Sequence, residues 1–341
     1  MGPSPGTISR PRGDLVKRIA RSLGFAACGI CDAAPVARRR YVLDWIEAGR
    51  HGEMSYLARN LQMRLDPGRL LPGARSVIMV AWLYRVAEPQ GGLPALSEAG
   101  APDIGVADAK SISPGRFGAI ARYAWGRDYH RVIRGRLRRL VDLMHQEVGQ
   151  AFESRICVDT APLLERELAQ RAGIGWIGGN CLAVNRTLGS YFCLGGVLTT
   201  LELPADSPAS DGCGACRRCV EACPTGALLE PHKMDPRLCL SYLTIERRGD
   251  VGPGPHPALH GRIFGCDVCQ EVCPYNGPKA AVSLDPDAQP RWPAGRIDCS
   301  TVLEWGPADW DAATRGRALR RATLKMWQRN ARLVAGDGTG T

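Results

Sequence analysis

The sequence predicts a mixed α/β protein with a larger N-terminal domain, a smaller cysteine-rich module and a short helical segment at the end. Three observations predict this organisation. Helical and strand patterns alternate before residue 205, eight of the fourteen cysteines lie between residues 213 and 273, and a basic stretch with helical spacing follows residue 315. A chain of 341 residues can form two compact domains.

The N-terminal domain is predicted from segments of different hydrophobic period. The segments "DLVKRIARSLG", "VLDWIEAG" and "RVIRGRLRRLVDLMHQEVG" have helical spacing, whereas "LGFAACGICDAAP", "ARSVIMVAWLY" and "SRICVDT" are short apolar runs typical of strands. The strand in "ARSVIMVAWLY" is almost continuously apolar, which indicates that both of its faces are covered. We expect this α+β or α/β domain to span residues 1–205.

The composition narrows the cellular setting and the partners. The start "MGPSPGTISRPRGDLVKR" lacks the apolar stretch of a signal peptide, and no run approaches 18 apolar residues. We therefore expect a cytoplasmic protein without membrane contact, and a monomer. The formal net charge of +10 favours a polyanionic partner such as nucleic acid.

The eight clustered cysteines predict two four-iron clusters, because thiolates are the ligands that such clusters need and eight is the number required for two. The run "CGACRRCVEACP" has the complete spacing of a bacterial ferredoxin, in which the fourth cysteine binds the other cluster. A second run, "CDVCQEVCPYN", repeats the ending but has Ile263 in place of its first cysteine.

Pseudo-symmetry between the two runs assigns the ligands. The first cluster takes Cys213, Cys216, Cys219 and Cys273, and the second takes Cys223, Cys239, Cys266 and Cys269, with Cys239 replacing the missing cysteine. Structural zinc is the alternative, but zinc loops rarely carry two interlocked C-x-x-x-C-P endings. We predict a bacterial-ferredoxin-like domain over residues 206–285, followed by a basic helical segment over residues 286–341.

The remaining cysteines favour a structural role. Cys28 and Cys31 form a C-x-x-C pair, yet they lie in an apolar run that is typical of a buried strand. Cys157, Cys181 and Cys193 also lie in apolar runs, so we expect all five in the core.

Asp159 is the most informative acid before the cysteines. It follows the strand "SRICV" and precedes "TAP", where a helix is expected to begin, so the local sequence favours a helix N-cap. The alternative is a general acid at a strand end, where α/β sheets present their sites. The following "GIGWIGGN" allows close approach of backbone to a ligand but lacks the G-x-G-x-x-G order of a dinucleotide site.

Taken in order, "HGEMSYLARN", "LLPGARSVI", "RYAWGRDYH", "VDTAPLLERELAQRAGIGWIGGN", the two cysteine runs and the intervening "CLSYLTIERRG" resemble the epoxyqueuosine reductase family. The resemblance runs from about Leu15 to about Gly336. It implies a corrinoid-binding N-terminal domain, similar to that of reductive dehalogenases, beside the iron–sulfur module. The implied reaction removes the epoxide oxygen of epoxyqueuosine at the wobble position of tRNA, with cobalamin at the site.

The resemblance also implies roles for individual residues. Asp159 in "VDTAP" matches the proton donor to the epoxide oxygen, which reverses the preference for an N-cap. The segments matching those that contact cobalamin carry Arg122, Tyr123, His130, Asp159, Asn180, Ala183, Tyr191, Leu194 and Glu246.

The chain departs from the family pattern in two places. Gly179 stands where the family usually has Lys, and we do not expect the C-terminal helical repeats of many members here. The corrinoid motif D-x-H-x-x-G also fails, because "DYHRVIR" has no glycine at the sixth place. This fits a family that uses cobalamin without a protein histidine on the cobalt.

A basic helix is expected to bind RNA. Arg317, Arg321, Lys325 and Arg329 lie four residues apart, which predicts one basic helical face that phosphate would neutralise, with Leu319, Ala322, Met326 and Leu333 on the opposing face. A solvated basic helix is the alternative. A second basic group consists of Arg131, Arg134, Arg136, Arg138 and Arg139.

Two other functions remain open at this stage. One is a corrinoid reductase of small molecules, although the expected export signal and any need for a basic helix are lacking. The other is an electron-transfer module for a partner, against which the long N-terminal domain argues. A reductase with two clusters implies an unidentified low-potential electron donor.

Overall fold

A four-stranded sheet forms the centre of the N-terminal domain. The computed structural model describes residues 5–87, 116–249, 251, 259–292 and 294–336. The strand order is β1 (Ala27–Asp32), β2 (Ser76–Leu83), β7 (Phe192–Thr199) and β4 (Ser154–Cys157), and every neighbouring pair is antiparallel. These are the strands predicted from the apolar runs around residues 27, 76 and 154, with β7 added between two of them.

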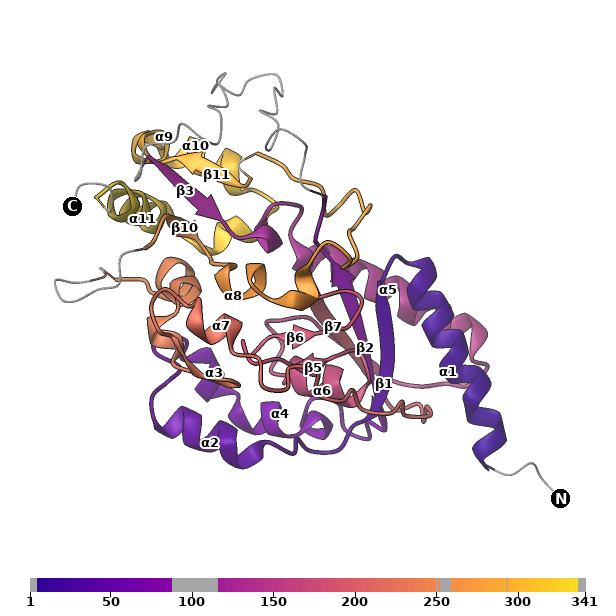
Figure 1. Cartoon of the computed structure of the whole chain (residues 1–341). Helices are drawn as coiled ribbons and strands as arrows, with labels where there is room; N and C mark the ends of the chain where they lie inside the picture. Colours follow the sequence, from indigo (N-terminus) through magenta and orange to yellow (C-terminus); the bar gives the residue numbers. More distant parts are fainter. Residues whose placement is uncertain (1–4, 88–115, 250, 252–258, 293, 337–341) are drawn as a thin grey trace.

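Helices cover both faces of this sheet. On one face, α1 (Pro5–Ser22) packs on β1 and α5 (Tyr129–Glu147) packs on β7 and β4, in one core with alternate residues of β2 such as Ile78 and Val80. On the other face, α6 (Glu165–Arg171) packs on the intervening residues of β2 (Figure 1). All eight residues of β2 are buried, so the predicted two-sided cover of this strand is confirmed.

A small second sheet joins distant parts of the chain. Its order is β10 (Arg262–Phe264), β3 (Phe117–Ile120) and β11 (Arg296–Asp298), with β10 parallel and β11 antiparallel to β3. The C-terminal segment therefore contributes a strand in addition to α9 (Cys299–Glu304), α10 (Pro307–Thr314), η6 (Ala318–Arg321) and α11 (Leu324–Gly336).

The buried ring of Trp327 fastens α11 to this sheet. It stacks on Phe264 of β10 at 5.3 Å between ring centroids and contacts Trp305 at 5.4 Å. The C-terminal segment is thus part of one hydrophobic core with the rest of the chain.

Short elements carry the cysteines and the loops near them. In chain order they are α2 (Arg39–Glu47), α3 (Tyr56–Arg59), α4 (Leu61–Leu65), η1 (Pro67–Arg69), η2 (Arg122–Ala124), β5 (Trp176–Ile177), β6 (Ala183–Val184), α7 (Arg218–Glu221), β8 (Leu228–Glu230), β9 (Lys233–Met234), η3 (Pro236–Leu238), η4 (Tyr242–Glu246), α8 (Val268–Glu271) and η5 (Pro274–Asn276). The helices α7 and α8, one from each cysteine run, pack against each other. No described helix has both the length and the apolar character that crossing a bilayer requires.

Two local predictions are wrong. The helix expected to begin after Asp159 begins six residues later, at Glu165, with Leu164 at its N-cap, so Asp159 does not cap it. The reason is the backbone of Asp159, which has a φ of 49° and turns the chain away from a helical path.

The second wrong prediction is the continuous basic helix expected from residue 315 onward. Gly316 has a left-handed φ of 72°, and α11 begins only after Thr323, whose hydroxyl accepts the N–H of Met326 at 3.4 Å. Consequently Arg317, Arg321, Lys325 and Arg329 do not share one helical face.

Candidate functional site

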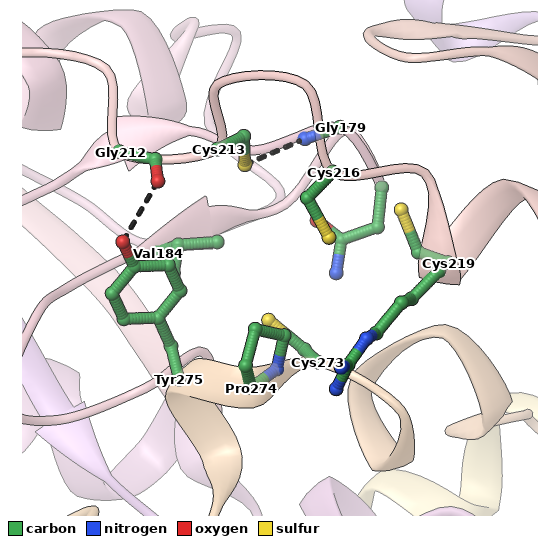
Figure 2. Close-up of a pocket in the computed structure, with 11 residues that line it drawn as sticks. Gly179, Val184, Gly212, Cys213, Cys216, Cys219, Cys273, Pro274 and Tyr275 are labelled. Atoms are coloured by element: carbon green, nitrogen blue, oxygen red, sulfur yellow. Dashed lines mark hydrogen bonds between the residues drawn. The ribbon is translucent and has the colours of Figure 1, made fainter.

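The four cysteines predicted for the first cluster lie around one cavity. Cys213, Cys216, Cys219 and Cys273 line a space of about 240 Å³, together with the glycine loop at Gly179 and Asn180. Figure 2 shows the four sulfur atoms directed into this space. Four thiols around a cavity of this size match the donor set and the room that a four-iron cluster needs.

Backbone and ring N–H groups point at one of these sulfur atoms. The Gly179 N–H donates to Cys213 Sγ at 3.4 Å, and the Trp176 indole donates to the same sulfur at 3.3 Å. Such donors stabilise a thiolate and tune the potential of a bound cluster. A Cβ at Gly178 would stand 2.7 Å from the Val184 side chain, so this glycine lets the loop come close to the cavity.

Gly179 itself is not required for space. A Cβ placed there would lie 3.5 Å from Cys219 Sγ, an ordinary contact. The Lys that the family pattern has at this position would therefore start beside the first cysteine set, and its charge is missing from this chain.

The four cysteines predicted for the second cluster influence one another. Burial raises the pKa of the Cys239 thiol, and Cys223 raises it further. Burial likewise raises the pKa of Cys266 to about 11, with Cys239 contributing. The pKa of Cys269 is raised by burial and then by Cys266 and Cys239, with Cys219 of the first set also contributing. The second set is therefore a group of neighbouring thiols that adjoins the first.

Asp159 lies at the end of a short chain of hydrogen bonds. Its Oδ2 is 2.8 Å from His130 Nε2, and the other ring nitrogen, Nδ1, is 2.8 Å from Asp128 Oδ1. Asp128 caps α5 by accepting the His130 N–H, and Tyr129 stacks on the His130 ring at 4.1 Å. Both ring nitrogens are thus engaged by carboxylates, which leaves neither for a metal.

The electrostatics place the proton on His130. Burial alone would lower the pKa of His130, but its hydrogen bonds to Asp128 and Asp159 outweigh burial and raise this pKa to about 9. Burial alone would raise the pKa of Asp159, but hydrogen bonds from His130 and Tyr129 lower it below its ordinary value. Near neutral pH the pair is an imidazolium beside a carboxylate.

Residues from distant segments surround Asp159. Glu165 accepts the Asp159 N–H at 2.8 Å, and burial, then the charge of Asp159, raises the pKa of Glu165 to about 8. Arg64 of α4 is buried, and its charge interacts with Tyr56, Asp159 and Glu165. Sequence reasoning missed Tyr56, Arg64 and Glu165. For Tyr56 and Glu165 the signal lay in the quoted motifs "HGEMSYLARN" and "VDTAPLLER", whereas Arg64 lies outside both.

The expected cobalamin contacts fall into three places. Tyr123 and His130 lie beside Asp159, since the charge of Asp159 acts on Tyr123 and its carboxylate contacts His130. Glu246 is connected to them through Arg321, which it binds and whose charge acts on Asp159. Asn180 lines the cysteine cavity, and Ala183 lies in the adjoining β6. Leu194 lies in β7, and Arg122 lies 5.6 Å from the ring of the buried Tyr191.

The expected RNA contacts differ in their surroundings. Arg317 is buried and donates to the carbonyl oxygens of Ala124 and Trp125. Arg329 donates to the carbonyl oxygens of Arg247 and Leu243. These two guanidinium groups therefore bind the C-terminal segment to backbone carbonyl groups of the preceding parts of the chain.

Arg321 and Lys325 are both exposed, but only Arg321 is described with a carboxylate partner. Arg321 forms two hydrogen bonds with the carboxylate of Glu246, whereas Lys325 is exposed on α11. On α5, the second basic group includes the exposed Arg131, Arg134, Arg138 and Arg139, while Arg136 pairs with Asp285 and Asp287.

The scattered cysteines divide by burial. Cys31 and Cys157 are buried as expected, whereas Cys28, Cys181 and Cys193 are only partly buried. Burial raises the pKa values of Cys28 and Cys31 to about 12, so this C-x-x-C pair is held as unreactive thiols.

Comparisons with known proteins agree on one family. The family model described as epoxyqueuosine reductase QueG, DUF1730 matches residues 64–160, and that of the 4Fe-4S double cluster binding domain matches residues 212–276. A curated epoxyqueuosine reductase of Synechococcus sp. (strain RCC307) is 42% identical over 326 residues, covering 93% of this chain and 92% of the relative.

Two solved structures of epoxyqueuosine reductases are similar over most of the fold. One, with an epoxyqueuosine-modified tRNA-Tyr stem loop, has a TM-score of 0.82 and 27% identity, covering 95% of this chain and 81% of that chain. The other, from Bacillus subtilis, has its aspartate catalytic loop swung out of the active site. Its TM-score is 0.80 at 26% identity, with coverage of 95% and 81%.

Proposed function

The chain belongs to the epoxyqueuosine reductase family, and from this membership we propose that it reduces epoxyqueuosine to queuosine at the wobble position of tRNA anticodons. The observation that carries the proposal is the combination of two adjoining four-cysteine sets with the Asp159–His130 pair in one molecule. A relative solved with an epoxyqueuosine-modified stem loop supports tRNA as the substrate.

The reaction must deliver two electrons and two protons. Both carbon–oxygen bonds of the epoxide break, the oxygen leaves as water, and the two carbons form an alkene. The chain therefore needs an electron route and a source of protons close to the epoxide oxygen. An external low-potential donor must supply the electrons, because electrons taken from the protein have to be replaced after every turnover.

Two four-iron clusters would supply one-electron transfer, held by the two cysteine sets. Cys213, Cys216, Cys219 and Cys273 would bind the first, and Cys223, Cys239, Cys266 and Cys269 the second. The thiol donors, the cavity of about 240 Å³ and the match to a double-cluster domain support these assignments. The raised thiol pKa values mean that cluster binding must displace protons from several of these cysteines.

Both cysteine sets are connected to the surroundings of Asp159 by described contacts. Asp267, next in the chain to Cys266, accepts the N–H of Arg122 at 2.7 Å, at the start of the loop that leads to His130. Cys181 is influenced by both Cys239 and Arg166, the neighbour of Glu165. The first set is linked as well, because the Gly179 N–H donates to Cys213 and Cys181 of the same loop accepts from Arg166.

Cobalamin would supply a strongly reducing cobalt centre next to the epoxide. The Asp159 carboxylate is 53% exposed and suits an amide-rich rim, and Asn180, which lines the cysteine cavity, is proposed from the resemblance alone. With it we propose the residues of the resemblance, namely Arg122, Tyr123, His130, Asp159, Ala183, Tyr191, Leu194 and Glu246. Because both ring nitrogens of His130 are engaged, we do not expect His130 to bind the cobalt.

Asp159 is the proposed proton donor to the epoxide oxygen. The carboxylate is ionised at rest, so it must first receive a proton, and His130 holds one at 2.8 Å. Proton transfer from His130 Nε2 to Asp159 Oδ2 loads the acid, and Asp128 stabilises the imidazolium that reforms from solvent. The Bacillus subtilis relative, in which an aspartate loop is called catalytic, supports this role.

RNA binding would use the basic groups that face solvent. Lys325, the exposed arginines of α5 and the outer edge of Arg321 can approach phosphate, whereas Arg317 and Arg329 act mainly inside the fold. We propose that residues 1–205 form the cobalamin and catalytic part, 206–285 the cluster part, and 286–341 a segment that supports RNA binding.

The test is conversion of the modified base by reconstituted protein. Protein loaded with iron, sulfide and cobalamin is given a chemical reductant and an epoxyqueuosine stem loop, and digested RNA is analysed by mass spectrometry. Queuosine should form with the complete protein and not when cobalamin is left out. Intact clusters and bound cobalamin without any queuosine would contradict the proposal.

A further inference from the structure

Glu165 is a half-buried acid that the proton route does not use. It is the first residue of α6, and its Oε1 accepts the backbone N–H of Asp159 at 2.8 Å. This bond spans six residues and closes the loop between β4 and α6 directly at Asp159.

The backbone conformation of Asp159 requires stabilisation by contacts such as this hydrogen bond. Its φ of 49° lies in the left-handed region, which residues with a side chain rarely adopt. Its side chain is 53% exposed, so packing does not fix it. The described contacts that hold this residue are those of His130 and Tyr129 to the carboxylate and that of Glu165 to the backbone.

Arg64 is a second unusual group at the same loop. It is 7% exposed, and its Nε has no hydrogen-bond partner among the described residues. The acidic groups whose charges act on it are Tyr56, Asp159 and Glu165. A buried cation is costly, and an aliphatic side chain would fill the space on α4 more favourably, so the charge itself has a use here.

Charged and ionisable groups face Glu165 from several elements. Asp159 comes from the loop, Arg166 from α6, His130 from α5 and Arg64 from α4, while Cys157 of β4 and Cys193 of β7 border it from the sheet. Two acids lie close together, and Arg64 offsets part of their mutual repulsion.

We propose that Glu165 is a positioning residue, which holds the backbone of Asp159 so that its carboxylate meets His130, and that Arg64 is the countercharge of this pair of acids. The inference rests on the proposed role of Asp159. The competing explanation is that Glu165 only favours the N-terminus of α6, as an acid in a first turn does.

Glu167 offers a matched control. It lies on the same helix, is 7% exposed, and accepts a backbone N–H from another loop, that of Ala37, at 2.6 Å. Replacing it perturbs α6 to a similar degree without touching Asp159.

The test follows hydrogen exchange of the peptide containing Asp159 in the cluster-loaded, cobalamin-loaded protein, together with kcat and KM for the stem loop. Glu165→Ala should raise exchange at the Asp159 amide on the order of tenfold and lower kcat by at least as much, with KM within about twofold. Glu165→Gln keeps an acceptor oxygen and should restore most of both. Glu167→Ala should change neither exchange at Asp159 nor kcat.

Arg64→Met should also raise exchange at Asp159, and by a smaller factor in a protein that already carries Glu165→Ala. Unchanged exchange in Glu165→Ala would overturn the proposal, as would a Gln variant as impaired as the Ala variant, or equal effects of Glu167→Ala. Exchange is measured without turnover, so a wild-type protein that forms no queuosine would contradict the proposed function while leaving this inference testable.

Discussion

Replacing Asp128 by Asn should move the alkaline limit of the reaction to lower pH. His130 is held between two carboxylates at 2.8 Å each, and its pKa is raised from 6.5 to about 9. This difference corresponds to about 3 kcal/mol in favour of the imidazolium. In Asp128→Asn the amide oxygen can still cap α5, so the helix start is retained while one charge is removed.

The sign follows from which form of His130 is needed. Only the protonated ring of His130 can transfer a proton to Asp159. The rate of queuosine formation therefore falls as the pH rises through the pKa of His130. Because burial opposes the two similar carboxylates, removing one of them should take away more than half of the net ~3 kcal/mol, which lowers the alkaline midpoint from about 9 to below about 8.

The assay is single-turnover conversion of the stem loop between about pH 6 and about pH 10, quenched and analysed by mass spectrometry. Both proteins should carry Glu165→Gln, because the pKa of Glu165, about 8, would otherwise add a titration in this range. His130→Gln is the control, in which the alkaline decrease of the pH–rate profile should disappear and the rate should fall by about 100-fold. A midpoint that stays near 9 in the Asp128 variant, or a wild-type limb near 6.5, would refute the reasoning.

Three further predictions concern other parts of the molecule. Cys239→Ser should lower bound iron to about half, whereas Cys299→Ser, a buried cysteine outside both sets, should leave the iron content unchanged; equal iron in both would remove Cys239 from the ligand set. Lys325→Ala should weaken stem-loop binding and reduce its salt slope by about 1, as measured by fluorescence anisotropy, while Arg75→Ala, whose guanidinium pairs with Glu202, should not; identical salt slopes would argue against phosphate contact at Lys325. Trp327→Ala removes a side chain that is 0% exposed and should cost about 3 to 5 kcal/mol of stability in anaerobic urea unfolding, against no loss for the 89% exposed Leu284→Ala; similar stability of both would mean that the C-terminal segment is not part of the core.

The sequence was most informative where spacing fixes geometry. The strands β1, β2 and β4 of the central sheet follow from their apolar runs, whereas β7 was not predicted, and the full burial of β2 follows from its lack of charged residues. The two cysteine runs assign Cys239 to the second set because one run lacks a ligand, and this assignment stays a prediction that the mutual influence of Cys239 with Cys223 and Cys266 supports.

The sequence was least informative where distant segments meet. Periodicity alone could not show that Gly316 and Thr323 interrupt the basic stretch, since a left-handed glycine and a hydroxyl cap act locally against a regular charge pattern. The same limit hid Arg64, which becomes part of the Asp159 surroundings only through the packing of α4 against that loop. Tertiary contacts of Arg329 were hidden in the same way: it was predicted to contact RNA, and in the structure it donates to backbone carbonyl oxygens.

The central claim is that Asp159 delivers the proton to the epoxide oxygen, and one comparison tests it most directly. Wild-type protein and Asp159→Asn are loaded with clusters and cobalamin to equal, spectroscopically verified occupancy, and queuosine formed on the stem loop is measured in a single turnover. We predict a rate at least about 100-fold lower for Asp159→Asn at unchanged occupancy and stem-loop affinity. Equal rates would contradict this claim and leave Asp159 without a catalytic role.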